Sequence, residues 1–371
     1  MSVNYFIYTS TLLGLMISQP VVATPTYEIT DLGTLGGNHS YAFGLNDLGQ
    51  VVGYSYMLGD YVRHAFIYEN GKMTDLGTLG GTDSFAYDIN NNGQVVGSSY
   101  TSSDDIYGHA FQYSNESMRD LGTWGYSDTN LSAINEAGQS VGSAYTQWFS
   151  SSSAYLNDNG NFQGLDSLGG RVNGANDINN SGQIVGYSYT ADDKEQHATL
   201  YNGTDIVDLG TLGGTYSWAS GINDSGQIVG AAYLANNDGY HGFIYQDGDM
   251  VDIGTLGGRF SGANEVNNHG VVVGYANTLN DDNHAFIYEN GIMTDLNALN
   301  GIAGTGWTLT DAQDINNRGQ IVGYGYNSQW QTRAFLLTPV PEPEVYGMLS
   351  AGIGLIGLVL RRRKINQFKL C

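Results

Sequence analysis

A repeat of 43 to 45 residues is the feature of this sequence that most limits the folds open to it. The segment Asp-Leu-Gly-Thr-Leu-Gly-Gly begins at Asp31, and it recurs, whole or degenerate, at Asp75, Asp120, Gly164, Asp208, Asp252 and Asp295. Two further signatures follow in each unit, Gly-Gln-Val/Ile-Val-Gly and His-Ala-Phe-Ile-Tyr, again with variants. Seven similar units in tandem indicate a repeat architecture in which neighbouring units share a continuous core.

Each unit contains four short candidate strands. In the first complete unit these are Ala42 to Asn46, Gln50 to Ser55, His64 to Glu69 and Met73 to Leu76. Asn and Gly between them favour tight turns, and no Pro interrupts the chain from residue 26 to residue 338, as paired strands require. Four antiparallel strands in this length are typical of one propeller blade, so the sequence predicts an all-β, seven-bladed β-propeller.

The two ends of the repeat region predict how such a ring closes. The last unit has only three candidate strands and ends near Leu337, whereas an extra one, Tyr27 to Gly33, precedes the first unit. Its segment Ile29 to Leu32 matches the fourth strand at Met293 to Leu296 position by position. We therefore expect the N-terminal strand to complete the last blade, because an open stack would need capping units instead.

Outside the repeats, two terminal segments have the composition of targeting signals. Residues 1–23 combine an apolar run with a small-residue site and predict a signal peptide, the alternative being a buried first strand. Residues 24–338 form the propeller region, and residues 339–371 form a tail that contains Pro341-Glu342-Pro343, an uncharged stretch and the cluster Arg361-Arg362-Arg363. The uncharged stretch, residues 345–360, would span about 24 Å as a helix, short of a bilayer core of about 30 Å. It predicts a transient membrane anchor.

Two resemblances add to this interpretation. The tail resembles the PEP-CTERM sorting signal, which implies export by a Gram-negative bacterium, a secreted or cell-surface location, and an exosortase-type processing enzyme as a partner. The three repeat signatures resemble the HAF family of extracellular repeats, named after its His-Ala-Phe, which implies location and architecture but no activity. The single Cys371 follows the basic cluster, so the processed protein would lack thiols.

Charge excludes one large class of function. Of 36 acidic and 13 basic residues, two acidic and five basic ones follow Val340, which leaves 34 acidic and 8 basic residues and a net charge of −26 before the tail. Such a surface repels phosphate backbones, so no nucleic-acid partner is expected. The sequence also contains no zinc-ligand spacing and no Gly-x-Ser-x-Gly nucleophile motif.

Residues that recur in every unit are expected to serve the scaffold. This applies to the turn Asn at positions 46, 90, 135, 179, 223, 267 and 316 and to the His of the His-Ala-Phe signature. The residues that differ between units lie in the connections between second and third strands and in those between blades. These connections are acidic and contain Trp, and they are expected to share one face of the ring.

Aromatic rings beside polar side chains are typical of sugar binding, so this face predicts a polysaccharide ligand. The candidate ligand-binding residues are Trp148 and Trp330 in second-to-third connections and Trp218 and Trp307 in between-blade connections. Oxygen-rich loops could also hold Ca²⁺, although none matches a complete calcium loop. The candidate ligands are Asp104, Asp105, Asp192, Asp193, Asp281 and Asp282.

The predicted function is that of an exported, non-catalytic binding or structural protein of the extracellular matrix or cell surface. The alternative is a polysaccharide-acting enzyme, a glycoside hydrolase or lyase, on the same scaffold. That alternative requires carboxylates that converge at the channel mouth, for which Asp104 and Asp192 are the candidates. The structural alternative to sugar binding is that the Trp residues only pack within the blades. The structural alternative to catalysis is that the acidic residues only form a solvated face.

Overall fold

A computed structural model describes residues 26–147, 150–203 and 205–340. Within these ranges the chain is almost entirely β-structure, as predicted. The predicted signal peptide, Pro341-Glu342-Pro343, the predicted membrane anchor at residues 345–360, the arginine cluster and Trp148 lie outside the described residues. No helix among the described residues is long and apolar enough to cross a membrane.

Twelve strands form three separate four-stranded sheets. The first contains β2 (Gly36–Leu45), β3 (Val51–Met57), β4 (Arg63–Glu69) and β5 (Lys72–Gly77). The second contains β6 (Ser84–Ile89), β7 (Val95–Ser99), β8 (His109–Ser114) and β9 (Ser117–Gly122). The third combines both ends of the described chain: β1 (Thr26–Asp31), β28 (Thr332–Val340), β27 (Ile321–Tyr326) and β26 (Thr308–Ile315).

The other strands belong to a 16-stranded sheet. Its first half contains β10 (Asp128–Ile134), β11 (Gln139–Tyr145), β12 (Ser152–Asp158), β13 (Asn161–Gly164), β14 (Gly169–Ile178), β15 (Ile184–Thr190), β16 (Gln196–Asn202) and β17 (Asp205–Asp208). Its second half contains β18 (Gly213–Ile222), β19 (Ile228–Leu234), β20 (Tyr240–Gln246), β21 (Asp249–Asp252), β22 (Gly257–Val266), β23 (Val272–Thr278), β24 (Asn283–Glu289) and β25 (Ile292–Asp295). The 3₁₀ turns η2 (Ala235–Asn237) and η3 (Leu296–Ala298) follow β19 and β25.

The large sheet consists of antiparallel groups of four that are weakly joined. Three parallel links connect the groups, β12 to β14, β16 to β18 and β20 to β22, and each consists of a single residue pair, such as Ser152 with Val172. By contrast, neighbouring strands inside a group pair over four to seven residues, as in β15 with β16. The groups are therefore separate hydrogen-bonded units, and the backbone link between neighbouring groups of this sheet is a single residue pair.

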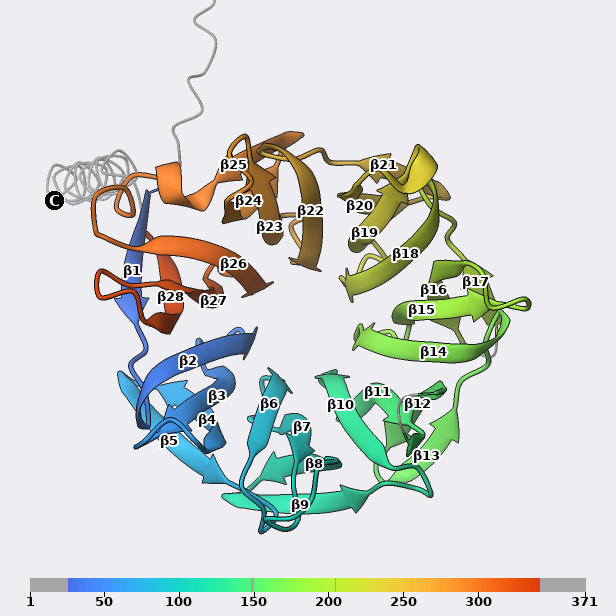
Figure 1. Ribbon diagram of the computed structural model, residues 1–371, viewed down its shortest axis with the longest axis horizontal. Coiled ribbons are helices and arrows are strands. Elements are labelled where there is room, and N and C mark those ends of the chain that lie inside the picture. The colour runs from blue at the N-terminus through green and yellow to red at the C-terminus, as the bar shows by residue number, and fades with distance from the viewer. Residues whose placement is uncertain (1–25, 148–149, 204, 341–371) are drawn as a thin grey trace, which may run out of the picture.

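The sheets surround a central axis, with the first strand of each group innermost (Figure 1). The inner strands are β2, β6, β10, β14, β18, β22 and β26. In β2, Gly36 pairs with Met57 at the end of β3, and Leu45 pairs with Val51 at its beginning. The inner strand thus runs from the side of the β3–β4 loop toward the turn at Asn46, so the channel has a loop side and a turn side.

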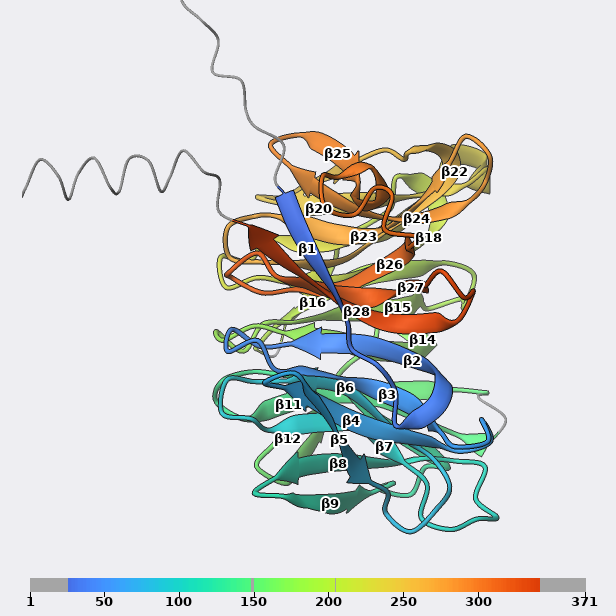
Figure 2. The same cartoon turned by 90° about the vertical axis from the view of Figure 1, so that its left-hand side faces the viewer.

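The N-terminal strand lies beside the last strand of the chain, as Figure 2 also shows. β1 pairs antiparallel with β28, with Ile29 opposite Leu337, which is the relation that β25 has to β24. Two hydrogen bonds extend this contact: Leu32 N donates to the Ala334 carbonyl at 3.1 Å, and Ala334 N donates to Ser40 Oγ of β2 at 3.0 Å. Residues some 300 positions apart therefore form one hydrogen-bonded unit.

The inner strand is longer than predicted, because it begins at Gly36 and not at Ala42. Gly36 has a φ of +114°, and a Cβ at Gly37 would lie 2.5 Å from Asp60 Oδ1 and 2.7 Å from the Met57 carbonyl oxygen. Glycine at both positions lets β2 cross tightly over the end of β3. The Gly-Gly of the first signature therefore starts a strand.

The apolar core lies between the groups, and the Phe of His-Ala-Phe is its largest residue. Phe66, Phe111, Phe243, Phe286 and Phe335 are fully buried. Phe66 of β4 packs in one cluster with Val322 and Leu336 of β27 and β28. Each group therefore buries apolar surface against its neighbour, and the packing fixes the inner strands around the channel.

Candidate functional site: the central channel

The repeated turn Asn holds both its own turn and the next one. Asn46 Oδ1 accepts hydrogen bonds from the backbone N–H groups of Leu48 and Gln50, at 3.1 and 2.9 Å. Its Nδ2 donates to the carbonyl oxygen of Asn90 at 3.0 Å. The same donation, at 3.0 to 3.2 Å, links Asn90 to Asn135, Asn135 to Asn179, Asn179 to Asn223, Asn223 to Asn267, Asn267 to Asn316 and Asn316 to Asn46. The structural role predicted for these Asn residues is confirmed.

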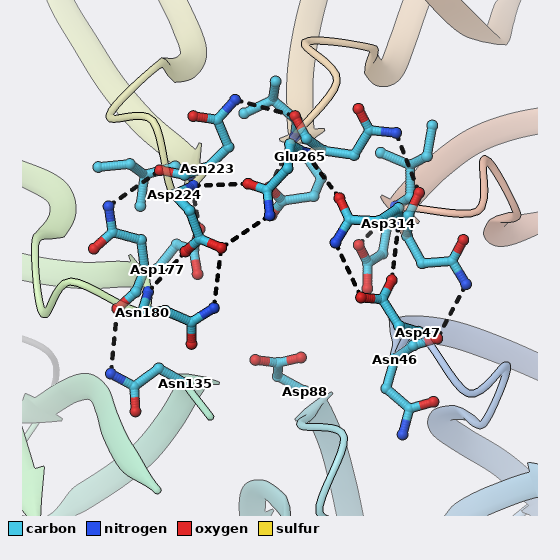
Figure 3. A pocket seen from close by; sticks show the side chains of 18 of the residues that line it. Asn46, Asp47, Asp88, Asn135, Asp177, Asn180, Asn223, Asp224, Glu265 and Asp314 are labelled. Atoms are coloured by element: carbon cyan, nitrogen blue, oxygen red, sulfur yellow. Dashed lines mark hydrogen bonds between the residues drawn. The ribbon is translucent and has the colours of Figure 1, made fainter. Parts of the chain in front are cut away.

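A second set of polar residues lines the turn-side mouth of the channel, one position after each turn Asn. The Asp47 backbone N–H donates to Asn91 Oδ1 at 2.9 Å, and the Asn317 backbone N–H donates to Asp47 Oδ1 at 2.8 Å. These side chains surround a cavity of about 180 Å³ (Figure 3). Since their polar atoms bond to one another, the mouth is a preformed polar rim.

Four carboxyl side chains lie deeper in the channel, two positions before a turn Asn. They are Asp88 on β6, Asp177 on β14, Glu265 on β22 and Asp314 on β26. The same position holds Gly44 on β2, Ala133 on β10 and Gly221 on β18. A Cβ at Gly221 would lie 2.7 Å from Glu265 Oε1. The small residue on a neighbouring strand therefore leaves the space that the acidic side chain occupies.

Three of these carboxylates connect adjacent inner strands. Asp88 accepts hydrogen bonds from the backbone N–H of Ile89 at 2.7 Å and from that of Ile134, on β10, at 2.8 Å. Asp177 binds Ile178 and Ile222 in the same way, and Asp314 binds Ile315 and Leu45. Glu265 accepts from its own neighbour Val266 at 2.8 Å. The carboxylates therefore join the inner strands as well as lining the channel.

Burial makes these groups weak acids. It raises the pKa of Asp88 to about 6 and that of Asp177 to about 7, against the opposing effect of the backbone N–H donors. Burial, followed by the negative charges of the other carboxylates, raises the pKa values of Glu265 and Asp314 well above their ordinary range. The four groups titrate as a set, because each charge disfavours the next.

A larger chamber of about 360 Å³ lies on the loop side of the carboxylates. It shares those four residues with the mouth cavity and is otherwise lined by aromatic, amide and hydroxyl side chains: Phe43, Tyr87, Asn130, Ser132, Asn176, Ser220, Asn264 and Gln313, together with Ala133. The rings of Phe43 and Tyr87 meet edge to face at 5.9 Å. Among the described residues, no Lys, Arg or His lines either cavity.

Sequence reasoning missed the channel carboxylates. Asp88, Asp177, Glu265 and Asp314 occupy a variable position two residues before the constant turn Asn. The alternation of an acid with Gly or Ala at this position was the available signal. It becomes meaningful only once the inner strands are known to face one another across a channel.

The three candidate Trp residues that the structure describes differ in their surroundings. Trp330, in the β27–β28 loop, is 80% exposed, and its φ is +59°. Trp307, just before β26, packs against the core with its ring 6.4 Å from that of Phe335. Trp218 was predicted to lie in a loop, and this is wrong: it lies within β18, with its ring 5.5 Å from Tyr240, because the inner strand begins at Gly213. Trp148 is outside the described residues.

The acidic loop residues are dispersed and partly engaged. Asp193 pairs with the Arg171 side chain at 2.7 Å and accepts from its backbone N–H at 2.8 Å, and Asp192 pairs with Lys194 at 2.9 Å. Asp105 accepts a hydrogen bond from the Thr101 hydroxyl. The remaining candidates, Asp104, Asp281 and Asp282, are exposed. In the described ranges, no three His, Cys, Asp or Glu side chains converge to hold a metal ion, so calcium binding stays a prediction.

The His residues of the third signature are also scaffold residues, as predicted. His64 Nδ1 lies 2.9 Å from the carboxylate of Asp75, the residue that begins the next copy of the first signature. Equivalent pairs at 2.7 to 3.1 Å are His109 with Asp120, His197 with Asp208, His241 with Asp252 and His284 with Asp295. Two of the three signatures are therefore linked through a single contact.

Comparison with known proteins defines the tail and the fold. Residues 339–364 match the PEP-CTERM protein-sorting motif, which confirms that part of the sequence interpretation. The motif indicates an exported, surface-sorted bacterial protein and implies processing by an exosortase. None of the curated proteins matches the chain.

Two solved structures resemble the repeat region. The β-propeller domain of the Trilobed protease from Pyrococcus furiosus, described as having an open velcro topology, aligns with a TM-score of 0.52 at 10% identity over 82% of this chain and 98% of that one. The acylaminoacyl peptidase of Pyrococcus horikoshii aligns with a TM-score of 0.53 at 12% identity over 86% of this chain. This chain covers 55% of that peptidase.

Likeness at these identities shows the fold alone, and the fold is that of a β-propeller. The chain is therefore an exported bacterial protein built on a β-propeller scaffold. The resemblance of its repeats to the HAF family stays a prediction.

Proposed function

We propose that this protein is a seven-bladed propeller, closed by its N-terminal strand, that acts as a non-catalytic binding or structural component of the extracellular matrix or cell surface of a Gram-negative bacterium. Its ligand is a polysaccharide, and residues 1–23 are its export signal. The repeats are those of the HAF type.

Two observations support a closed ring. The Asn hydrogen bonds run from each turn to the next and return from Asn316 to Asn46. β1 supplies to β28 the fourth strand that the last group otherwise lacks. In an open arrangement, β28 would be an unpaired edge and the turns at Asn46 and Asn316 would have no reason to meet.

The loop-side chamber carries the functional part of the proposal. Its wall combines two aromatic rings, amides, hydroxyls and carboxyls, which is the set of groups that can pack on a sugar ring and hydrogen-bond its hydroxyls. The repeated Asn and His are already engaged within the scaffold. Ligand binding therefore falls to the residues that differ between units.

A glycan array tests this proposal. Residues 24–340, labelled at the N-terminus, are applied with and without EDTA. We expect retention on a narrow set of polysaccharides, unchanged by EDTA if binding depends on side chains alone and lost if calcium takes part. Absence of retention on every glycan would contradict polysaccharide binding.

A glycoside hydrolase or lyase is the second candidate, and one observation favours it. Carboxyl groups with raised pKa values serve as general acids in such enzymes, and the channel contains Asp88 and Asp177, with pKa values of about 6 and about 7. These groups, and not Asp104 and Asp192 on separate exposed loops, would be the catalytic candidates. The hydrogen bonds that Asp88 and Asp177 make to two inner strands favour a structural role.

The proposed sorting route has its own test. Replacing Pro341, Glu342 and Pro343 with Ala should leave the protein in the membrane fraction, whereas the unchanged chain should be released without its tail. The intact mass of the released protein decides between the two, because a mass that includes Arg361 to Cys371 would contradict processing.

A further inference from the structure

We propose that the loop-side chamber binds an amino sugar, a ligand that is rich in hydroxyl groups and carries a protonated amine, with Glu265 as the anchor of the amine. This inference rests on the proposed glycan-binding function and adds the class of sugar and the residue that selects it.

The first argument is that the channel is lined by acidic groups without a basic partner. The chamber and the mouth share Asp88, Asp177, Glu265 and Asp314, and no basic side chain of the described residues lines either cavity. The further charged side chains that line the mouth are also acidic: Asp47, Glu136 and Asp224. A cationic ligand in this channel meets only acidic groups, and its charge favours their ionised form, so a cationic group is favoured over a neutral or acidic one.

Arg318 does not neutralise this field. Its guanidinium donates to the backbone carbonyl of Asp47 at the rim, and the residue lines neither cavity. Asp311 accepts hydrogen bonds from Asn264, in the chamber lining, at 2.7 Å and from the Tyr324 hydroxyl at 3.1 Å. It is a further acidic group, so the chamber has no neighbouring positive charge from either residue.

The free oxygen of Glu265 is the second argument. In Asp88, Asp177 and Asp314, both carboxyl oxygens accept backbone hydrogen bonds. Glu265 accepts one, from Val266 to Oε1, and its Oε2 has no partner in the described part of the chain. Figure 3 shows this side chain at the pocket. A carboxylate that lines the channel with one oxygen free can accept a charge-assisted hydrogen bond from an ammonium group.

A bare metal ion fits this arrangement less well. The channel carboxylates do not converge as metal ligands within the described ranges. A ligand that extends through the chamber can instead meet several groups in turn. The hydroxyls of Ser132 and Ser220 line the chamber, and neither has a hydrogen-bond partner among the described residues. The ring of Phe43 provides an apolar surface in the same wall.

The size of the chamber agrees with a sugar. Its volume of about 360 Å³ falls within the range of small-molecule pockets, about 300–1,000 Å³. The combination of aromatic surface, hydroxyls and one free carboxylate oxygen therefore selects a polyhydroxylated ligand with a single amine near Glu265.

Isothermal titration calorimetry with three matched probes tests the inference on residues 24–340. The probes are short oligomers of glucosamine, N-acetylglucosamine and glucose with the same linkage, at neutral pH. We expect the glucosamine oligomer to bind about tenfold tighter or more than the other two, as a charge-assisted hydrogen bond predicts. Glu265→Gln keeps the bond from Val266 and should remove this preference, whereas the exposed control Glu289→Gln should leave it unchanged.

A second variant covers the case in which Glu265→Gln perturbs the fold. Ser220→Trp places an indole in the chamber and should abolish binding of the glucosamine oligomer. Equal affinity for all three oligomers, retained in Glu265→Gln, would overturn the inference and leave glycan binding intact. Heat released by calcium chloride alone and lost in Glu265→Gln would indicate a metal site and would also overturn it. No binding of any oligomer, with a blank glycan array, would contradict both proposals.

Discussion

Gly186, in the second strand of its unit, occupies a position where no side chain can be placed. A Cβ there would lie 2.0 Å from the carbonyl oxygen of Gly174 on the inner strand. The same approach, at 1.9 to 2.0 Å, occurs at Gly53, Gly97, Gly142, Gly230, Gly274 and Gly323. The last Gly of the second signature is therefore required by close strand contact, whereas the first, such as Gly182 with a φ of +78°, is required by its turn.

Replacement of Gly186 by Ala should be strongly destabilising. The added methyl group forces β14 and β15 apart, and we expect a loss of about 1–3 kcal/mol or more in the free energy of unfolding. Gly164→Ala is the matched control, since nothing lies within 4 Å of its Cβ, and it should change stability by less than about 0.5 kcal/mol. Urea denaturation measures both, and equal stabilities would refute the packing argument.

The Trp residues should separate into packing and surface residues. Trp307 packs against the core and Trp330 is 80% exposed. Trp307→Ala should therefore lower the free energy of unfolding by about 2 kcal/mol, and Trp330→Ala should change it by less than about 0.5 kcal/mol. Thermal unfolding of the two variants is the measurement, and a reversed order would show that the loop Trp is structural.

At this scale the sequence predicted the scaffold better than the site. Asn46 and His64 recur at a fixed period, and recurrence alone indicated a structural task that their hydrogen bonds bear out. Glu265 could not be recognised in the same way, because its environment comes from strands that are distant in sequence. Its space is left by Gly221, on β18. Such complementarity across a channel has no local signal.

Among the elements, β1 joins the two ends of the described chain by pairing with β28. Tyr27 is 4% exposed and packs in the cluster that contains Leu296, Ile302 and Phe335. Its N–H also donates to the Asn300 carbonyl at 3.2 Å. The six-residue strand β1 is thus held by its hydrogen bonds to β28 and by the buried ring of Tyr27.

Removal of this strand should open an edge. A chain of residues 34–340 should unfold at a lower temperature than residues 24–340 and should self-associate through the exposed edge of β28. Tyr27→Ala should reproduce part of the loss, about 3 kcal/mol for a large core residue, whereas Glu28→Ala, an exposed neighbour, should not. Calorimetry and light scattering are the measurements, and an unchanged melting temperature in the shortened monomer would contradict closure by β1.

The sequence predicted strand boundaries correctly where Asn and Gly form the turns. The predicted boundaries were wrong where glycine residues lie inside a strand. The predicted strand at His64 to Glu69 differs from β4 by one residue. The inner strand begins six residues before its predicted start. Gly ordinarily weakens a strand, but Gly36 and Gly37 allow β2 to cross closely over the end of β3. The loop position expected for Trp218 was wrong for the same reason.

For the molecule as a whole, the channel carboxylates predict how stability depends on pH. Burial raises the pKa of Asp177 from 3.8 to about 7, and that of Glu265 is raised well above its ordinary value. Between about pH 4 and pH 7 the folded state therefore keeps protons that the unfolded state has released. The stability associated with the protonated carboxyl groups is fully present below about pH 4 and is lost as the pH rises through about 7. Urea denaturation should show lower stability at about pH 8 than at about pH 5.5.

The variant Glu265→Gln provides the control for this effect. It removes one buried charge and keeps an acceptor for the Val266 N–H, so it should raise stability at about pH 8 by on the order of 1 kcal/mol and reduce the pH dependence. Glu289→Gln, at an exposed position, should do neither. If Glu265→Gln and the parent showed the same dependence of unfolding free energy on pH, ionisation of Glu265 would not destabilise the folded state.

The claim that this exported ring binds a polysaccharide without cleaving it is tested most directly by recovering the glycan. The glycan best retained on the array is incubated with excess residues 24–340, released, and analysed by mass spectrometry for chain length. We predict that the glycan binds and is recovered at its full length. Shortened or unsaturated fragments that form with the parent protein and not with the Asp177→Asn variant would contradict the account. They would show that the protein is an enzyme whose catalytic acid lies in the channel.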